Sequence, residues 1–383
     1  MKYMEQGEFP VSRYLTAKAA AQKIPVTGTF ELTSRCNFNC KMCYIHGMED
    51  MDSLRKGELS VKEWLSIAEE AKKEGLLFLL LTGGEAMIRD DFMELYEALA
   101  QMGFRFVINT NGSLVTDEIL DLFRRYPPGR VNVSMYGASE ETYGRLCGVR
   151  RRDRVAKTIQ DLKALGISVR TTMTITPYNC EDMQAVYEFS RREGTLLEMT
   201  SYMFPPVRRD EGMQGENAAR FSAEEAGRYM VEKECIALTP EQRQERAVKV
   251  TEHVKRMEEI LSDPQREKPE CGKGIICQAG RSSFWITWDG RMKICGLTSE
   301  PRRTSGSWDS PRRGRRPTGQ RLRSACRWSA ARVQGQSFAV PVPLCARPRP
   351  GIMTTGRSMC VTCLRLCWRF TAGKRSAGVR CDG

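Results

Sequence analysis

Short apolar, β-prone runs alternate along the first half of the chain with longer segments whose apolar residues recur every three or four positions. The short runs predict buried strands, and the longer segments predict amphipathic helices. The predicted strands are 28–33, 76–82, 104–109, 130–136, 167–176 and 196–202, and the predicted helices are 60–74, 91–102, 116–125, 152–165 and 181–192. This alternation predicts an α/β fold with a parallel sheet and helices outside it. Six units are too few for a complete eight-stranded barrel, so we expect a partial (β/α)6 TIM-like barrel.

Three cysteines follow the first predicted strand in the stretch C-N-F-N-C-K-M-C. They are Cys36, Cys40 and Cys43. A loop this short can bring three thiols together around one metal ion or cluster. Three thiolates without an obvious fourth partner suit a cubane iron–sulfur cluster with one iron left unligated. Zinc normally takes a fourth protein ligand from the same neighbourhood. A zinc loop and three reduced structural thiols remain the alternatives for the triplet alone.

The triplet resembles the cluster loop C-x3-C-x-φ-C of the radical S-adenosylmethionine (radical SAM) superfamily, with Met42 at the usually aromatic φ position. The resemblance implies a partial barrel and a [4Fe-4S] cluster held by the three cysteines. It also implies that the open iron is chelated by S-adenosylmethionine, and that an electron from the cluster cleaves this molecule to methionine and a 5′-deoxyadenosyl radical. The radical then abstracts a hydrogen atom from a substrate.

A second motif, Thr82-Gly-Gly-Glu85, follows the second predicted strand. Two glycines allow a backbone to approach a ligand closely, and a carboxylate can accept hydrogen bonds from an ammonium group. Gly83, Gly84 and Glu85 resemble the superfamily's GGE(P) motif, which holds the amino group of S-adenosylmethionine, although Ala86 replaces the proline. A plain strand-to-helix turn is the alternative for this motif alone.

Three residues near later strand ends have weaker resemblances to cofactor-binding positions. Asn111 lies in a T-N-G turn after the third predicted strand, and Ser134 lies near the end of the fourth. Relatives place a serine like Ser134 on the ribose or carboxylate of the cofactor, and an arginine like Arg145 on its carboxylate. A capped turn and a surface arginine are the alternatives for Ser134 and Arg145.

A second group of cysteines, Cys271, Cys277 and Cys295, accompanies a hairpin signal at Asp289-Gly290. Thiols flanking a hairpin resemble the first half of the SPASM extension, which holds auxiliary iron–sulfur clusters in peptide-modifying members of the superfamily. An auxiliary [4Fe-4S] cluster is therefore expected at these cysteines. A small hairpin with incidental cysteines is the alternative.

The composition changes after about residue 300, where Arg, Pro, Ser, Gly and Cys dominate without a helical or strand period. The spacing Cys360-x2-Cys363-x3-Cys367-x13-Cys381 differs from the C-x2-C-x5-C-x3-C expected in the second half of SPASM. Our hypothesis is a shift of the reading frame near residue 300, which would leave a disordered tail and remove auxiliary-cluster ligands. A basic nucleic-acid arm and an unusual metal knuckle are the alternatives.

Charge and hydropathy bear on whether the protein binds nucleic acid or a membrane. The chain carries a formal charge of +13, but residues 301–383 contain 17 Arg, one Lys and two acidic residues, so residues 1–300 are close to neutral at −3. Basicity therefore gives no argument for a nucleic-acid partner. The longest apolar run, residues 76–81, is too short to cross a membrane. We expect a cytoplasmic protein without a membrane partner, in which 15 cysteines indicate metal or redox chemistry rather than disulfides.

The expected organisation is a lead-in (1–27), a radical SAM core (28–205), a helical connector (206–269), a partial SPASM-type hairpin (270–300) and the tail (301–383). The resemblance implies a maturase-like enzyme, similar to anaerobic sulfatase maturases, that acts on a peptide or protein. It also implies a low-potential electron donor such as flavodoxin or ferredoxin. The alternatives are a non-catalytic zinc or iron–sulfur protein and a maturase inactivated by loss of auxiliary ligands.

The frameshift hypothesis predicts that translating the gene in the other two frames after codon 300 restores a dense cysteine cluster containing C-x2-C-x5-C-x3-C. The coding sequence alone decides this. If neither frame restores the cluster, the tail is encoded as it stands.

Overall fold

The computed structural model describes residues 10–22, 24–45, 50–201, 219–262, 279, 282–293 and 295–296. Within these ranges eight strands form one sheet with the order β6-β5-β4-β3-β2-β1-β7-β8. The strands are β1 (Thr27–Glu31), β2 (Phe78–Thr82), β3 (Arg105–Thr110), β4 (Arg130–Ser134), β5 (Val169–Thr174), β6 (Leu196–Thr200), β7 (Ser283–Ile286) and β8 (Met292–Lys293). Every neighbouring pair is parallel except β7 and β8.

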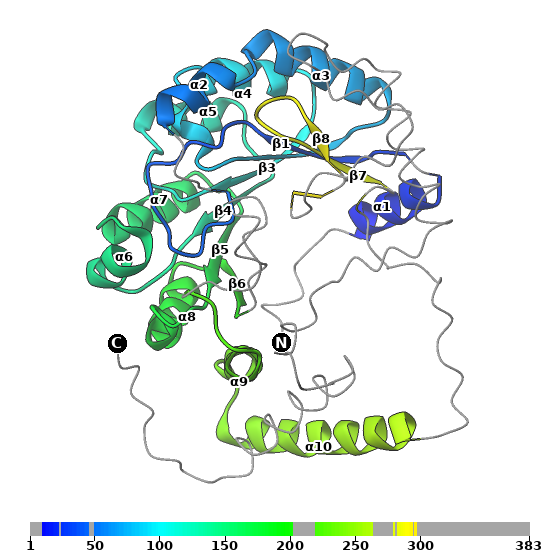
Figure 1. Ribbon diagram of the computed structural model, residues 1–383, viewed down its shortest axis with the longest axis vertical. Coiled ribbons are helices and arrows are strands. Elements are labelled where there is room, and N and C mark those ends of the chain that lie inside the picture. Colours follow the sequence, from blue (N-terminus) through cyan, green and yellow to red (C-terminus); the bar gives the residue numbers. More distant parts are fainter. Residues whose placement is uncertain are drawn as a thin grey trace.

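The helices lie along the outer side of this curved sheet, which confirms the predicted partial barrel (Figure 1). They are α2 (Met51–Gly57), α3 (Val61–Lys73), α4 (Phe92–Gln101), α5 (Asp117–Arg125), α6 (Glu140–Cys147), α7 (Arg152–Ala164) and α8 (Met183–Arg192), with short 3-10 turns η1 (Ala86–Ile88) and η2 (Cys180–Asp182). Helix α1 (Pro10–Gln22) precedes the barrel, and α9 (Ala223–Cys235) and α10 (Pro240–Ser262) follow it.

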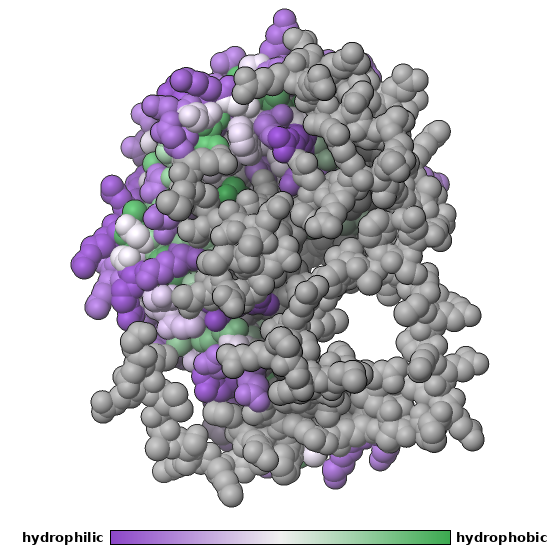
Figure 2. All heavy atoms as spheres, viewed as in Figure 1, coloured by the Kyte–Doolittle hydropathy of each residue, from purple (hydrophilic) through white to green (hydrophobic). Residues whose placement is uncertain are grey.

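Local sequence explains where these helices begin and which face they bury. The hydroxyl of Ser60 accepts from the Glu63 amide, and the Glu63 carboxylate accepts from the Ser60 amide, so the helix predicted over 60–74 begins with a capping box. Trp64, Ile67, Ala68 and Ala71 then share one buried face of α3. The described outer helices carry mainly hydrophilic side chains toward solvent (Figure 2). No helix in the described part of the chain has the length and apolar character needed to cross a membrane.

The strands divide their side chains between two faces. In β4, Val131 and Val133 are fully buried in the core shared with the helices, while Asn132 and Ser134 are half-buried on the other face. This alternation follows from the two-residue period of a strand. The inner face of the partial barrel is therefore partly polar, and its carboxyl edge carries the loops that follow each strand.

The C-terminal hairpin is more closely joined to the barrel than the sequence indicated. The antiparallel pairing of β7 with β8 confirms the predicted hairpin, but β7 also pairs in parallel with β1. Phe284 and Ile286 are buried in the main core. The sequence missed this pairing because β1 and β7 are separated by most of the chain.

Two tryptophans attach the hairpin to the barrel. The indole nitrogen of Trp285 donates to the Glu31 carboxylate at the end of β1 (2.9 Å). The carbonyl of Trp288 accepts from the Leu59 amide (3.0 Å). The Trp288 ring also covers Gly57, where an added Cβ would lie 2.7 Å from it.

We expect Trp285→Phe to lower the free energy of unfolding by about 1–3 kcal/mol, because it removes a donor from a buried carboxylate. Urea denaturation followed by circular dichroism measures this change. Trp288→Phe is the matched control, since it retains a ring over Gly57, and its loss should be smaller. Equal losses in the two variants would contradict a specific role for the Trp285–Glu31 hydrogen bond.

Candidate active site

The cysteine loop extends from β1 at the carboxyl edge of the sheet. Cys36, Cys40 and Cys43 are all half-buried and present as free thiols. Phe38 is buried between them and meets the Tyr143 ring edge-to-face, with 6.5 Å between ring centroids. The loop is therefore anchored to the core by its own apolar residue.

The Gly-Gly-Glu motif lies directly against the beginning of this loop. The Gly84 amide donates to the Thr33 carbonyl (2.8 Å), and the Glu85 amide donates to the Arg35 carbonyl (2.9 Å). A Cβ on Gly83 would lie 2.5 Å from the Thr33 carbonyl oxygen, and one on Gly84 would overlap the Arg35 carbonyl. Only glycine permits this approach, so the two motifs are held side by side by their backbones.

Glu85 is fully buried, and its carboxylate is occupied by protein donors. It accepts from the Thr110 hydroxyl (2.9 Å), the Asn111 amide (2.7 Å) and the Met87 amide (3.2 Å). Burial raises the pKa of Glu85, although these three hydrogen bonds oppose the shift. Its side chain thus fixes the turn after β3, and the contact of Glu85 with the amino group of the cofactor stays a prediction.

Asn111 joins that turn to the cysteine loop. The side-chain nitrogen of Asn111 (Nδ2) donates to the Asn37 side-chain oxygen (2.9 Å) and lies 3.8 Å from the Cys36 sulfur. The Phe38 amide also donates to this sulfur (3.4 Å). Asn37 in turn donates to the Ser113 hydroxyl (2.8 Å). Sequence reasoning missed Asn37 and Ser113, although their places inside one motif and directly after another were a usable signal.

The remaining predicted cofactor residues lie farther along the edge. Ser134 is half-buried at the end of β4, and its carbonyl accepts from the Tyr143 hydroxyl (3.5 Å). Arg145 is exposed on α6 and donates to the Tyr178 carbonyl (3.4 Å). Its hydrogen bond is thus to the segment after β5 and not to Gly83 or Gly84.

The predicted auxiliary-cluster cysteines are only partly described. Cys271 and Cys277 lie outside the described residues. Cys295 is half-buried just after β8. The next residue, Gly296, packs so closely on the Trp285 ring that a Cβ there would lie 2.6 Å from it. The auxiliary cluster stays a prediction.

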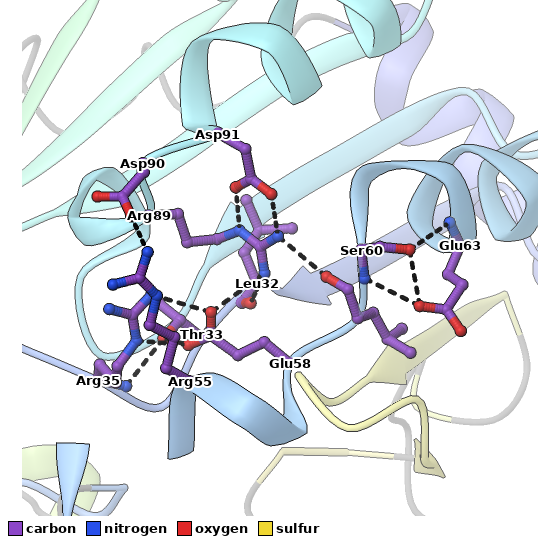
Figure 3. A network of polar contacts seen from close by, with 11 residues as sticks. Leu32, Thr33, Arg35, Arg55, Glu58, Ser60, Glu63, Arg89, Asp90 and Asp91 are labelled. Atoms are coloured by element: carbon purple, nitrogen blue, oxygen red, sulfur yellow. Dashed lines mark hydrogen bonds and ion pairs between the residues drawn. The ribbon is translucent and has the colours of Figure 1, made fainter. Parts of the chain in front are cut away.

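A charged network fixes the residues just before Cys36 (Figure 3). Arg35 forms a two-point ion pair with Glu58 (2.7 and 2.9 Å), and the Thr33 hydroxyl donates to the same carboxylate. The hydrogen bonds with Glu58 raise the pKa of Arg35 further. Arg89 also contacts Glu58 (3.4 Å) and pairs with Asp91 (2.8 Å).

Arg89 additionally ties the network to the backbone. Its guanidinium donates to the Leu32 and Leu59 carbonyls (2.9 Å each). The Glu58 and Arg89 side chains are only 7% and 3% exposed, so these charges are paired away from solvent. The sequence did not indicate the network, because charged residues at such spacings look like ordinary surface positions.

Two of the loop thiols have raised pKa values. Burial raises the pKa of Cys36 to about 12. A hydrogen bond with the Cys147 thiol, together with burial, raises the pKa of Cys40. Metal ligation requires thiolates, so a metal must displace these protons.

The donor set suits an iron–sulfur cluster. One anchored loop offers three half-buried thiols, and two N–H groups approach the Cys36 sulfur. Such N–H contacts stabilise the negative charge on cluster sulfurs. In the described part of the chain no group of three Cys, His, Asp or Glu side chains is placed to hold a metal ion, the three loop thiols included. Cys40 must therefore exchange its hydrogen bond with Cys147 for a metal bond on loading.

The fold and this loop define an α/β barrel domain built around a cysteine cluster site. Residues 30–190, from β1 to α8, match the family model described as the Radical SAM superfamily. Residues 30–190 are therefore similar to a radical SAM domain, and enzymes of this superfamily use a [4Fe-4S] cluster and S-adenosylmethionine.

Two curated relatives that are similar to this sequence have names that describe different reactions. An AdoMet-dependent heme synthase from Methanosarcina barkeri is 30% identical over 183 residues, which cover 48% of this chain and 52% of the relative. A "Probable GTP 3′,8-cyclase" from Saccharolobus islandicus is 33% identical over 165 residues, which cover 43% and 52%. The chain spans about half the length of these curated relatives.

Solved structures of SuiB from Streptococcus suis share the fold. The structure bound to S-adenosylmethionine has a TM-score of 0.53 at 18% identity and covers 77% of this chain and 66% of SuiB. The structure bound to the precursor peptide SuiA has a TM-score of 0.52 at 17% identity, with 76% and 66% covered. At these identities the similarity concerns the fold alone.

We expect Glu58→Gln to lower the free energy of unfolding by about 3–5 kcal/mol, because it removes the carboxylate that pairs two buried guanidinium groups. Urea denaturation of the metal-free protein measures the loss. Asp90→Asn is the matched control, since the Asp90–Arg55 pair is exposed and should contribute about 0–1 kcal/mol. A small loss for Glu58→Gln would show that the network does not stabilise the loop.

Proposed function

We propose that this protein binds a [4Fe-4S] cluster through Cys36, Cys40 and Cys43 and reductively cleaves S-adenosylmethionine to form a 5′-deoxyadenosyl radical. The observation that carries this proposal is the backbone pairing of the cysteine loop with Gly84 and Glu85. This pairing holds the cysteine loop and a glycine-rich turn at the same edge of the partial barrel, which supports the proposal. When bound, the cluster and its cofactor supply the electron transfer and the radical.

The chain's own residues bind and orient these groups. The three thiols supply ligands, and the N–H groups of Phe38 and Asn111 approach the sulfur of Cys36. Gly83 and Gly84 allow the glycine-rich turn to lie directly against the backbone of Thr33 and Arg35, and we propose that its backbone receives the amino group of the cofactor. Ser134, at the same edge, is proposed to contact its ribose or carboxylate.

Arg145 is proposed for the cofactor carboxylate on the family resemblance alone. In the structure its side chain is exposed and donates to the Tyr178 carbonyl. A role at the cofactor therefore requires this side chain to change its partner.

We propose a peptide or protein as the substrate. The structural neighbour SuiB, which binds a precursor peptide, supports this class. The curated relatives are named heme synthase and GTP cyclase, so small molecules are the alternative class of substrate. The proposal includes a low-potential donor such as flavodoxin or ferredoxin and an auxiliary cluster at Cys271, Cys277 and Cys295.

Anaerobic reconstitution with iron and sulfide tests the proposed function. We expect a brown protein with charge-transfer absorption that forms 5′-deoxyadenosine from S-adenosylmethionine under dithionite. Replacing Cys36, Cys40 and Cys43 together by Ala should reduce this product to background, because the cluster loses all its loop ligands. Cys235→Ala, in α9, is the matched control and should retain the activity. A colourless protein that binds zinc and forms no 5′-deoxyadenosine would support the non-catalytic alternative.

A further inference from the structure

A fourth cysteine lies beneath the cluster loop. Cys147 is the last residue of α6 and is fully buried. The Asn39 amide donates to the Cys147 carbonyl, and the Lys41 amide donates to the Leu146 carbonyl, both at 2.9 Å. These two hydrogen bonds fix the backbone on either side of Cys40 to the end of α6.

These two backbone hydrogen bonds, called the clamp below, bring the Cys40 and Cys147 thiols together. The backbone hydrogen bonds on both sides of Cys40 bring it to the end of α6, where its side chain interacts with the Cys147 side chain. Gly148 follows Cys147 in the left-handed conformation (φ +71°), and a Cβ there would lie 3.4 Å from the Asn39 Cβ. The end of α6 and the loop are therefore packed together without an intervening layer. A buried cysteine is often only a small apolar residue, but this one contacts an expected cluster ligand.

We propose that Cys40 and Cys147 form an oxidative modification site, a disulfide that closes when the cluster is absent and removes Cys40 from the ligand set. The clamp brings the two backbones close, as a disulfide requires. Cys40 cannot bind iron and Cys147 at once, so closure and cluster loading exclude each other. Only this consequence for loading rests on the proposed function.

Hydrogen peroxide is a sufficient oxidant. Cys40 is half-buried while Cys147 is shielded, so Cys40 reacts first, as the thiolate formed when it releases its proton, giving a sulfenic acid and one water. The Cys147 sulfur then attacks the Cys40 sulfur, forming the S–S bond and releasing the second water. Two electrons leave the two thiols, and one peroxide is reduced to two waters. A thiol reductant reverses the reaction.

Peptide mapping of the metal-free full-length protein tests the site directly. Trypsin releases Cys40 in the peptide 36–41 and Cys147 in the peptide 146–150, since each peptide is bounded by Arg or Lys. After treatment with peroxide and alkylation of the remaining thiols, we expect these two peptides joined. Fragmentation should place the link on Cys40 and not on Cys36. A bond inside the peptide 36–41, or links to Cys43 only, would overturn the proposal.

Cluster loading provides the second readout. Peroxide-treated protein, reconstituted without a thiol reductant, should take up several-fold less iron and sulfide than untreated protein, and dithiothreitol should restore uptake. Cys147→Ala should remove most of this sensitivity, whereas Cys180→Ala, which replaces another buried thiol, should leave it unchanged. Circular dichroism confirms that both variants are folded. Equal sensitivity of Cys147→Ala and wild type would overturn the proposal.

The mapping separates this inference from the proposed function, because it needs neither a cluster nor S-adenosylmethionine. A protein that forms the cross-link but cleaves no S-adenosylmethionine retains the modification site and loses the proposed activity. A protein that cleaves the cofactor but never joins the two peptides retains the activity and loses the site.

Discussion

The site depends on the absence of two side chains. Gly83 and Gly84 allow the end of β2 to hydrogen-bond with the backbone just before Cys36, at distances that a Cβ would prevent. The cysteine loop therefore takes its position from a neighbouring strand and not only from its own sequence. Any residue larger than glycine would push the loop away from the edge where a ligand could contact both motifs.

Charge pairing extends this support to a distant part of the chain. Glu58 pairs with Arg35, next to the first cysteine, while the adjacent Gly57 lies under the ring of Trp288 in the hairpin. The hairpin also reaches the end of β1 through Trp285 and Glu31. Both contacts end at segments that flank the loop, so the hairpin helps to hold the cysteine loop in place.

The sequence predicted most of the barrel because its signals are local. A capping box at Ser60, glycines after helices and apolar runs each depend on a few neighbouring residues. The same reasoning found the cysteine triplet and the Gly-Gly-Glu motif, but it did not reveal the contact of Cys147 with Cys40 and missed the pairing of β7 with β1. Those features depend on contacts between residues far apart in the chain, and no local period reports them. Glu58 was missed for the same reason, since its burial becomes visible only in the fold.

The free-energy cost of binding a cluster would depend on how well the loop is already ordered and on the raised pKa values of two of its thiols. Phe38, Asn37 and the Arg35–Glu58 pair already order the loop, so little conformational entropy remains to be lost on loading. The remaining cost is chemical, because Cys36 and Cys40 both have raised pKa values and must release protons. Cys40 must also leave Cys147. The loop is therefore ordered, and Cys40 would have to release both its proton and its contact with Cys147 before it could bind a metal.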